Sequence, residues 1–262
     1  LLYSIGPSLA YGLSAGLGFV AILPMLGIVY VREPERVIER PTLAAALEGL
    51  KFVRRTPIVL ASISLDLFAV LFGGAVALIP AVASERLGVG DIAYGWLRAA
   101  PGVGAAVMAI WLAVRPVQRR VGPTLLWVVA AFGAGTMVFG LTHNYVVAFL
   151  ALVVLSAADM VSMYIRGSIV PLVTPDDQLG RVSAVEGVFI GASNELGAFE
   201  SGVTARAFGL PWSIAGGGFL TILVAGSFAA LFPSLRRVDT FTELDPKRRQ
   251  QTDPSGLSRT DD

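Results

Sequence analysis

The sequence predicts an all-α integral membrane protein with about seven transmembrane helices. Hydrophobic residues make up 55% of the 262 residues, and the mean hydropathy is +0.71. Charged residues make up only 15%, whereas a soluble domain usually carries about 25%. The charges fall in short blocks between long apolar runs, as expected of a chain that crosses a bilayer repeatedly.

Seven apolar segments are long enough to span the hydrocarbon core, which requires roughly 20 helical residues. The predicted spans are residues 8–31, 58–81, 94–114, 123–141, 145–173, 182–208 and 212–232. Because the first span starts without a methionine or a basic leader, we expect a fragment whose upstream sequence is absent.

The predicted organisation has four parts. Residues 1–31 hold the last helix of an absent N-terminal half, and residues 32–56 form a cytoplasmic linker. Leu43, Leu47, Leu50 and Val53 recur at helical spacing in that linker, which predicts an amphipathic surface helix. Residues 57–235 form a six-helix bundle, and the polar residues 236–262 are predicted to be a disordered tail.

Basic residues concentrate in alternate loops. One set of loops holds Arg32, Arg36, Arg40, Lys51, Arg54, Arg55, Arg115, Arg119, Arg120, Arg181, Arg236 and Arg237. The opposite loops hold only Arg86 and Arg206. The positive-inside rule places the first set in the cytoplasm, so the chain begins outside and its C-terminus is cytoplasmic. The predicted location is the cytoplasmic (inner) membrane of a bacterium, with multiple crossings.

Acidic residues within the spans are the main functional candidates, because an ionised group in hydrocarbon is costly and usually faces a cavity or a partner. Asp66, Asp159 and Glu195, with its neighbour Asn194, share roughly the same depth. A carboxyl group withdrawn from water can exchange a proton near neutral pH, as proton coupling requires.

Two interpretations remain open for Asp159 and Arg166. They are seven residues apart and share one helix face, so they belong either to a structural network or to a transport pathway. Asp66 and Glu195 have no basic neighbour in sequence, which favours the pathway. Glu195 is predicted to matter more to transport than Glu200. Five residues turn the two carboxylates to different faces, and Glu195 lies at mid-helix, where we expect it to be buried, whereas Glu200 lies nearer the outside.

The distribution of charges predicts an internal repeat. The fourth and seventh spans carry no ionisable residue, whereas the second and fifth carry acids, which fits two inverted three-helix repeats. Gly12 and Gly16, and also Gly187 and Gly191, are four residues apart and predict close helix contacts.

Enzymatic and cofactor chemistry is not expected. The chain has no cysteine and one histidine, His143, so thiolate and multi-histidine metal sites lack their ligands. There is no P-loop, and Asp91 of a protease-like Gly-x-Gly-Asp run lies in a polar loop without an aspartate partner. The net charge of +1 gives no field for nucleic acid.

Several stretches resemble one family. They are FIGASNELGAFESG, DMVSMYIRGSIVPLVTP, the ending LFPSLRRVDTF and the Gly180-Arg181 turn. They are similar to the major facilitator superfamily, in the branch of enterobactin-type exporters and transmembrane secretion effectors. The resemblance implies twelve helices, of which the first span here is the sixth and the other six are the C-terminal bundle.

The loop VRPVQRRVGPT resembles a degenerate copy of the superfamily's Asp-Arg-x-Gly-Arg signature. Arg119 and Gly122 are retained, Gln118 stands in place of the acid, and Pro123 replaces a basic residue. The resemblance implies a gating role for such loops, with Arg119, Gly122, Gly180 and Arg181 as candidates. The departures weaken that role for this loop.

The resemblance also implies a function: alternating-access export of hydrophobic or amphipathic small molecules, driven by proton antiport. The implied partners are the substrate, protons, the lipid bilayer and the missing N-terminal helical bundle. Asp66, Asp159, Arg166, Asn194 and Glu195 are the candidate transport residues. The alternative is a non-transporting assembly or sensor module derived from a truncated transporter.

Overall fold

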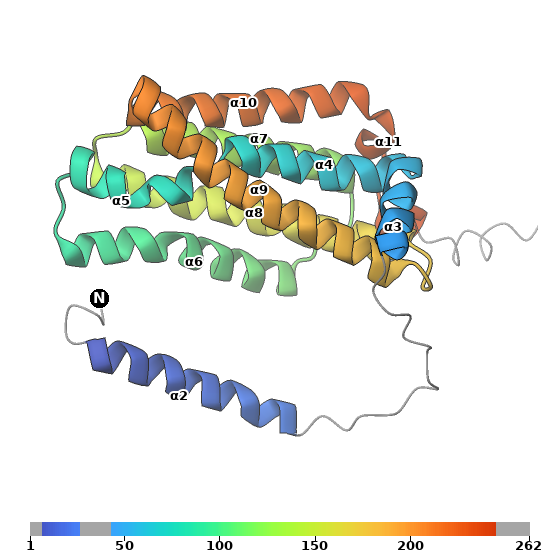
Figure 1. Ribbon diagram of the computed structural model, residues 1–262, viewed down its shortest axis with the longest axis horizontal. Coiled ribbons are helices and arrows are strands. Elements are labelled where there is room, and N and C mark those ends of the chain that lie inside the picture. Colours follow the sequence, from blue (N-terminus) through green and yellow to red (C-terminus); the bar gives the residue numbers. More distant parts are fainter. Residues whose placement is uncertain (1–6, 27–42, 245–262) are drawn as a thin grey trace, which may run out of the picture.

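The structure, a computed structural model, describes residues 7–26 and 43–244, and these residues form helices and turns with no strand. The helical elements are α2 (Pro7–Leu26), α3 (Leu43–Arg55), α4 (Pro57–Phe72), η1 (Ala75–Leu78), α5 (Ile79–Ala81), η2 (Val82–Arg86), α6 (Asp91–Val114), α7 (Val121–Leu141), α8 (Tyr145–Val173), α9 (Leu179–Phe208), α10 (Leu210–Leu231), α11 (Pro233–Arg236) and η3 (Phe241–Leu244). Figure 1 shows the long segments from α4 to α10 side by side in one bundle, with α3 across one end. The predicted linker residues 32–42 lie outside the described residues.

The membrane fold class predicted from the sequence is confirmed. Five described segments are long and apolar enough to cross a bilayer: Pro57–Arg86, Asp91–Val114, Val121–Leu141, Tyr145–Val173 and Leu210–Leu231. The predicted span 182–208 corresponds to α9, whose 30 residues measure roughly 45 Å. Its glutamates and arginines make it more polar than the other five. α2 contributes a shorter apolar stretch, Tyr11–Val20.

The predicted helix 58–81 is longer and less regular in the structure. It runs from Pro57 to Arg86 and is interrupted after α4 by Gly73 and Gly74, which lead into η1, α5 and the π-helical turn η2. Both glycines lie where a side chain would collide with neighbouring helices, Gly73 with Phe132 and Gly74 with the Gly197 backbone. The two glycines therefore let this part of the chain pack against the Phe132 ring of α7 and the backbone of α9.

Glycines mediate the closest helix contacts in the bundle. A Cβ at Gly104 would collide with the Val153 backbone where α6 meets α8, and Gly133 and Gly218 oppose each other where α7 meets α10. Small residues at such crossings allow backbones to pack without intervening side chains. The pairs Gly12–Gly16 and Gly187–Gly191, predicted to make such contacts, instead face open space in the described chain.

All four tryptophans are exposed on the bundle. On α6, Trp96 lies near the start and Trp111 near the end, with 47% and 56% of their surfaces exposed. Trp127 and Trp212 lie near the starts of α7 and α10 and are 76% and 69% exposed. Tryptophans at the ends of apolar helices are typical of the membrane–water interface.

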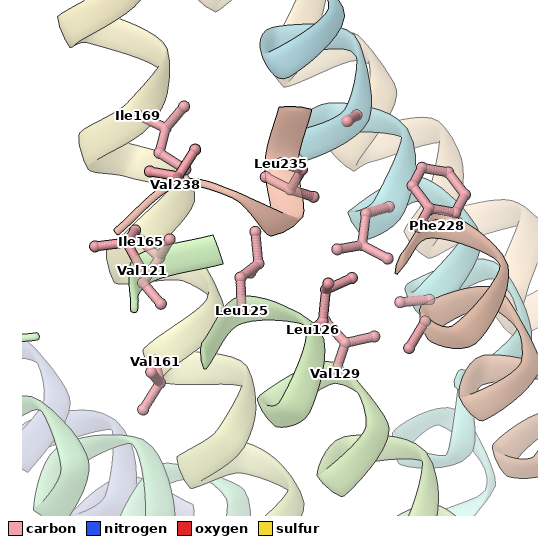
Figure 2. Packing of buried hydrophobic residues seen from close by; sticks show 14 of the residues in the cluster. Val121, Leu125, Leu126, Val129, Val161, Ile165, Ile169, Phe228, Leu235 and Val238 are labelled. Atoms are coloured by element: carbon pink, nitrogen blue, oxygen red, sulfur yellow. The ribbon is translucent and has the colours of Figure 1, made fainter. Parts of the chain in front are cut away.

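The prediction of a disordered tail is wrong for residues 236–244. Residues 236–244 pack against the bundle: Val238 is 5% exposed, and the Phe241 ring lies edge-on to Tyr164 of α8, with 6.2 Å between ring centroids. Figure 2 shows Val238 beside Ile169 of α8 and Leu235 beside Leu125 of α7. Apolar residues at 235, 238, 241 and 244 give this polar-looking segment a buried side. Residues 245–262 lie outside the described residues.

The predicted amphipathic helix is present as α3. Val53 is 1% exposed and packs with Val59 of α4 and Val182 of α9. A Cβ at Gly49 would lie 2.8 Å from the Arg181 carbonyl oxygen, so α3 sits directly on the start of α9. Lys51, Arg54 and Arg55 are exposed.

Candidate functional site

An ion pair inside the bundle is the centre of the candidate site. Arg166 of α8 places an Nη2 atom 2.7 Å from Oδ1 of Asp66 of α4, and both residues are only 6% exposed. The Arg166 Nε donates a hydrogen bond to the Ser162 Oγ, one turn earlier on α8, at 3.3 Å. The guanidinium is therefore fixed between two helices by a carboxylate and a hydroxyl.

The local sequence fixes the register of the two helices that supply this pair. α4 begins with Pro57, whose fixed φ suits the first helical position. α8 begins at a side-chain cap, in which Oδ1 of Asn144 accepts hydrogen bonds from the amides of Val146 and Val147 at 2.9 and 3.2 Å. A capped start and a helical run of 29 residues carry Arg166 to its depth in the bundle.

A small pocket adjoins the ion pair. It is lined by Asp66, Ala69, Val70, Val128, Val129, Phe132, Asp159 and Ser162. These residues come from α4, α7 and α8, so the pocket lies where three helices meet. Its wall is mostly apolar, and its polar groups are two carboxylates and one hydroxyl.

The sequence analysis considered Asp159 together with Arg166, whereas in the structure Arg166 forms its ion pair with Asp66. Asp66, which has no basic neighbour along the chain, forms the ion pair, whereas Asp159 is exposed and lines the pocket. Arg166 nevertheless acts electrostatically on Asp159 and on Glu186 of α9. The electrostatic influence of this buried cation thus reaches carboxyl groups on three helices, and its ion pair is with Asp66.

This arrangement has two electrostatic states. With Asp66 ionised, the pair is neutral overall, which offsets the large cost of burying each charge. Protonation of Asp66 would leave the Arg166 charge without its nearest counterion and would strengthen the relative attraction of Asp159 and Glu186.

Asn194 and Glu195 do not belong to this cluster in the described chain. Both are exposed on α9, and the Asn194 side chain donates a hydrogen bond to the Ile190 carbonyl at 2.8 Å. The burial expected for mid-helix Glu195 is therefore not seen in the described chain. Glu200, on another face as predicted, is partly buried, and its backbone carbonyl accepts a hydrogen bond from the Thr204 hydroxyl at 2.9 Å.

The candidate loop residues lie at the end of the bundle that carries α3. Arg181 forms an ion pair with Glu48 of α3, with 2.6 Å between Nη1 and Oε2, and Gly180 borders open space. Arg119 pairs with Asp239, with 3.4 Å between Nε and Oδ2. The partners Glu48, Ser162 and Asp239 were not identified from the sequence. Only Ser162 left a signal, because it lies four residues before Arg166.

At the opposite end, Arg86 of η2 donates hydrogen bonds to the carbonyl oxygens of Gly140 and Leu141, the last residues of α7. Its guanidinium also lies 2.9 Å from the His143 Nε2. The histidine is thus part of a helix-end contact. Among the described residues, no group of three His, Cys, Asp or Glu side chains is placed to hold a metal ion.

The sequence matches a known family over most of its length. The family of transmembrane secretion effectors matches residues 1–255. The chain is 29% identical over 224 residues to the enterobactin exporter EntS of Escherichia coli O1:K1 / APEC, a match that covers 80% of this chain and 53% of the exporter. EntS of Shigella boydii serotype 18 (strain CDC 3083-94 / BS512) is 28% identical, with the same coverage.

The chain spans about half the length of the curated relatives it matches. No solved structure shows significant similarity to this chain. The family match, the all-helical fold and the membrane-length helices agree. The chain belongs to the transmembrane secretion effector family of the major facilitator superfamily.

Proposed function

We propose that this chain is the C-terminal half, with one preceding helix, of a secondary transporter that exports small molecules by proton antiport. The observation that carries the proposal is the buried Asp66–Arg166 pair beside a pocket that Asp159 also lines. Transporters of this general kind place substrate and coupling-ion sites near the bilayer midplane. Family membership and the similarity to enterobactin exporters support export over the alternative of a non-transporting module.

In this mechanism, Asp66 is the proton carrier and Arg166 its counterion. When Asp66 is ionised, Arg166 is held on α4. When Asp66 is protonated, Arg166 turns toward Asp159 and Glu186, so the contact between α4 and α8 weakens. A carrier whose helix contacts differ between two protonation states can couple proton movement to a conformational change.

The pocket lining indicates the class of substrate. Val70, Val128, Val129 and Phe132 provide apolar contacts, and the carboxylates provide hydrogen-bond acceptors. Such a surface suits a hydrophobic or amphipathic small molecule, and the enterobactin of the similar exporters is the first substrate to test. The pocket is too small for it in this half alone, so we infer that the missing N-terminal bundle supplies the rest of the binding site.

The location follows from the same reasoning. We propose insertion in the bacterial cytoplasmic membrane with α3, the α6–α7 loop and the C-terminus on the cytoplasmic side. The distribution of basic residues supports this orientation.

The test uses the complete gene product in proteoliposomes, with enterobactin and a fluorescent amphipathic dye as probes. An imposed pH gradient should drive probe movement in the wild type, and Asp66→Asn should abolish it. Asp177→Asn, which alters an exposed aspartate between α8 and α9, should transport normally. Probe movement that persists unchanged when the gradient is dissipated would refute the antiport mechanism.

A further inference from the structure

Two sequence motifs about 120 residues apart meet at the start of α7. The Val121 amide donates a hydrogen bond to the Asp239 carbonyl at 3.1 Å, and the Gly122 amide donates one to the Val238 carbonyl at 3.0 Å. The Arg120 amide donates one to Oδ1 of Asp239 at 3.0 Å. The first amides of a helix have no partner within that helix. Here the segment that follows α10 provides acceptors for three amides at the start of α7.

The two motifs also fit sterically. Arg120 adopts a left-handed backbone conformation, with φ of 54°. A Cβ at Gly122 would collide with the Leu235 carbonyl oxygen, so only glycine lets the two segments approach this closely. The glycine retained from the superfamily signature is thus explained by contact with the chain after α10.

The strength of each contact can be ranked. The Arg119–Asp239 ion pair is exposed, with 81% and 39% of the two side chains accessible, and such pairs contribute little to stability. The hydrogen bond from the Arg120 amide to the same carboxylate lies at the start of a helix, and the loss of such a capping bond usually costs more stability than the loss of an exposed ion pair. The main task of the Asp239 carboxylate is therefore to hold the start of α7.

This contact is continuous with the candidate transport site. Leu235 and Val238 belong to a buried cluster with Val121 and Leu125, as Figure 2 shows. The same cluster contains Leu65 and Ile165, which precede Asp66 and Arg166 in sequence. Loosening the segment after α10 would therefore loosen the packing beside the ion pair.

We propose that residues 233–244, here called the clasp, hold the α6–α7 loop and the start of α7 in place, with Asp239 as a positioning residue on which export depends. The α6–α7 loop has Gln118 where the superfamily signature has an acidic residue, and Asp239 places a carboxylate at this loop from another part of the chain. The dependence of export on the clasp rests on the proposed function. The contact itself does not.

The experiment introduces Val121→Cys into a cysteine-free version of the full-length protein. Val121 is fully buried, so the thiol should react slowly with a maleimide. Asp239→Ala should raise the labelling rate about fivefold, the factor expected when one helix cap is lost. Asp239→Asn keeps an acceptor oxygen and Arg119→Gln removes only the exposed pair, so both should stay within about twofold of the parent.

Export of enterobactin is measured on the same variants. Asp239→Ala should lower the maximal rate severalfold with an unchanged half-saturating concentration, and Asp239→Asn should restore the rate. A purely structural defect would not be rescued in this pattern. Asp177→Ala, at an exposed aspartate of the α8–α9 loop, is the matched control and should change neither measurement.

Three results would overturn the proposal: unchanged labelling in Asp239→Ala, labelling of Asp239→Asn as fast as that of Asp239→Ala, or full export by a protein whose clasp has opened. If the wild type exports no probe, the proposed function fails, and the labelling ratios still decide whether the clasp exists. If Asp239→Ala does not insert, Asp239→Ser, with a shorter capping oxygen, should label at an intermediate rate.

Discussion

Replacing Asp66 and Arg166 separately and together should separate stability from transport. The Arg166 guanidinium contacts the side chains of Asp66 and Ser162. In Asp66→Leu it stays buried and loses the first of these partners. Removing one partner of a buried pair costs about 3–5 kcal/mol, because the remaining charge loses its nearest counterion. The double variant Asp66→Leu/Arg166→Met buries no charge at this position, and such replacements are often neutral or stabilising by about 1–4 kcal/mol.

The assay is thermal unfolding of the full-length protein at fixed detergent concentration, followed by loss of the monodisperse peak. A change of 1 kcal/mol shifts the midpoint by roughly 2–4 °C for a domain of the size of this bundle, so Asp66→Leu should unfold roughly 6–20 °C lower if the bundle unfolds as one unit. The double variant should unfold within a few degrees of the wild type. Both should lack gradient-driven export, because neither carries the proton-binding group.

Two results would refute this reasoning. If Asp66→Leu unfolds within 2 °C of the wild type, the pair is not a buried charge pair in the complete protein. If the double variant exports at the wild-type rate, the pair is structural, and the carrier role passes to Asp159 or Glu195. Asp177→Leu controls for the loss of an acidic residue.

Three further predictions use other parts of the chain. Gly104→Ala should destabilise the protein by about 1–3 kcal/mol, because its Cβ would meet the Val153 backbone, whereas Gly102→Ala, two residues earlier and facing open space, should be neutral or slightly stabilising in a thermal melt. Glu195→Gln should reduce gradient-driven export more than Glu200→Gln at matched expression, and equal rates would count against it. Single cysteines at the exposed positions Ser84 and Asn144 should react with an impermeant maleimide added outside, and single cysteines at the exposed positions Ser183 and Ser234 should not. The reverse pattern of labelling would show that the topology is inverted.

The sequence predicted the fold well because hydrocarbon imposes a strong length and composition signal. The apolar runs of α6, α7, α8 and α10 were located within a few residues of their ends. The interruption at Gly73 was missed, since apolar residues continue on both sides of it. The packed residues 236–244 were missed because their apolar positions are separated by arginines and by Asp239, which read as a solvated tail.

The candidate site was only partly predictable. The depth of Asp66, Asp159 and Arg166 followed from counting residues along each span. Their pairing did not, because rotation of one helix about its axis relative to another leaves no trace in a single sequence. Asp66 therefore gained a partner 100 residues away, while Asp159, two turns from Arg166 on the same helix, lines the pocket instead.

The exposed face of α9 bears on which acid carries the proton. Gly187, Gly191 and Glu195 recur at helical spacing on that face, and both glycines border open space. An ionised glutamate facing hydrocarbon is costly, so a lipid-facing position is a poor place for Glu195. Small residues around it are typical of a surface that another helix approaches. Glu195 is thus exposed in the described part of the chain, whereas Asp66 already has its counterion there. Export by Asp66→Asn that survives, together with its loss in Glu195→Gln, would place proton exchange on this outer face of α9.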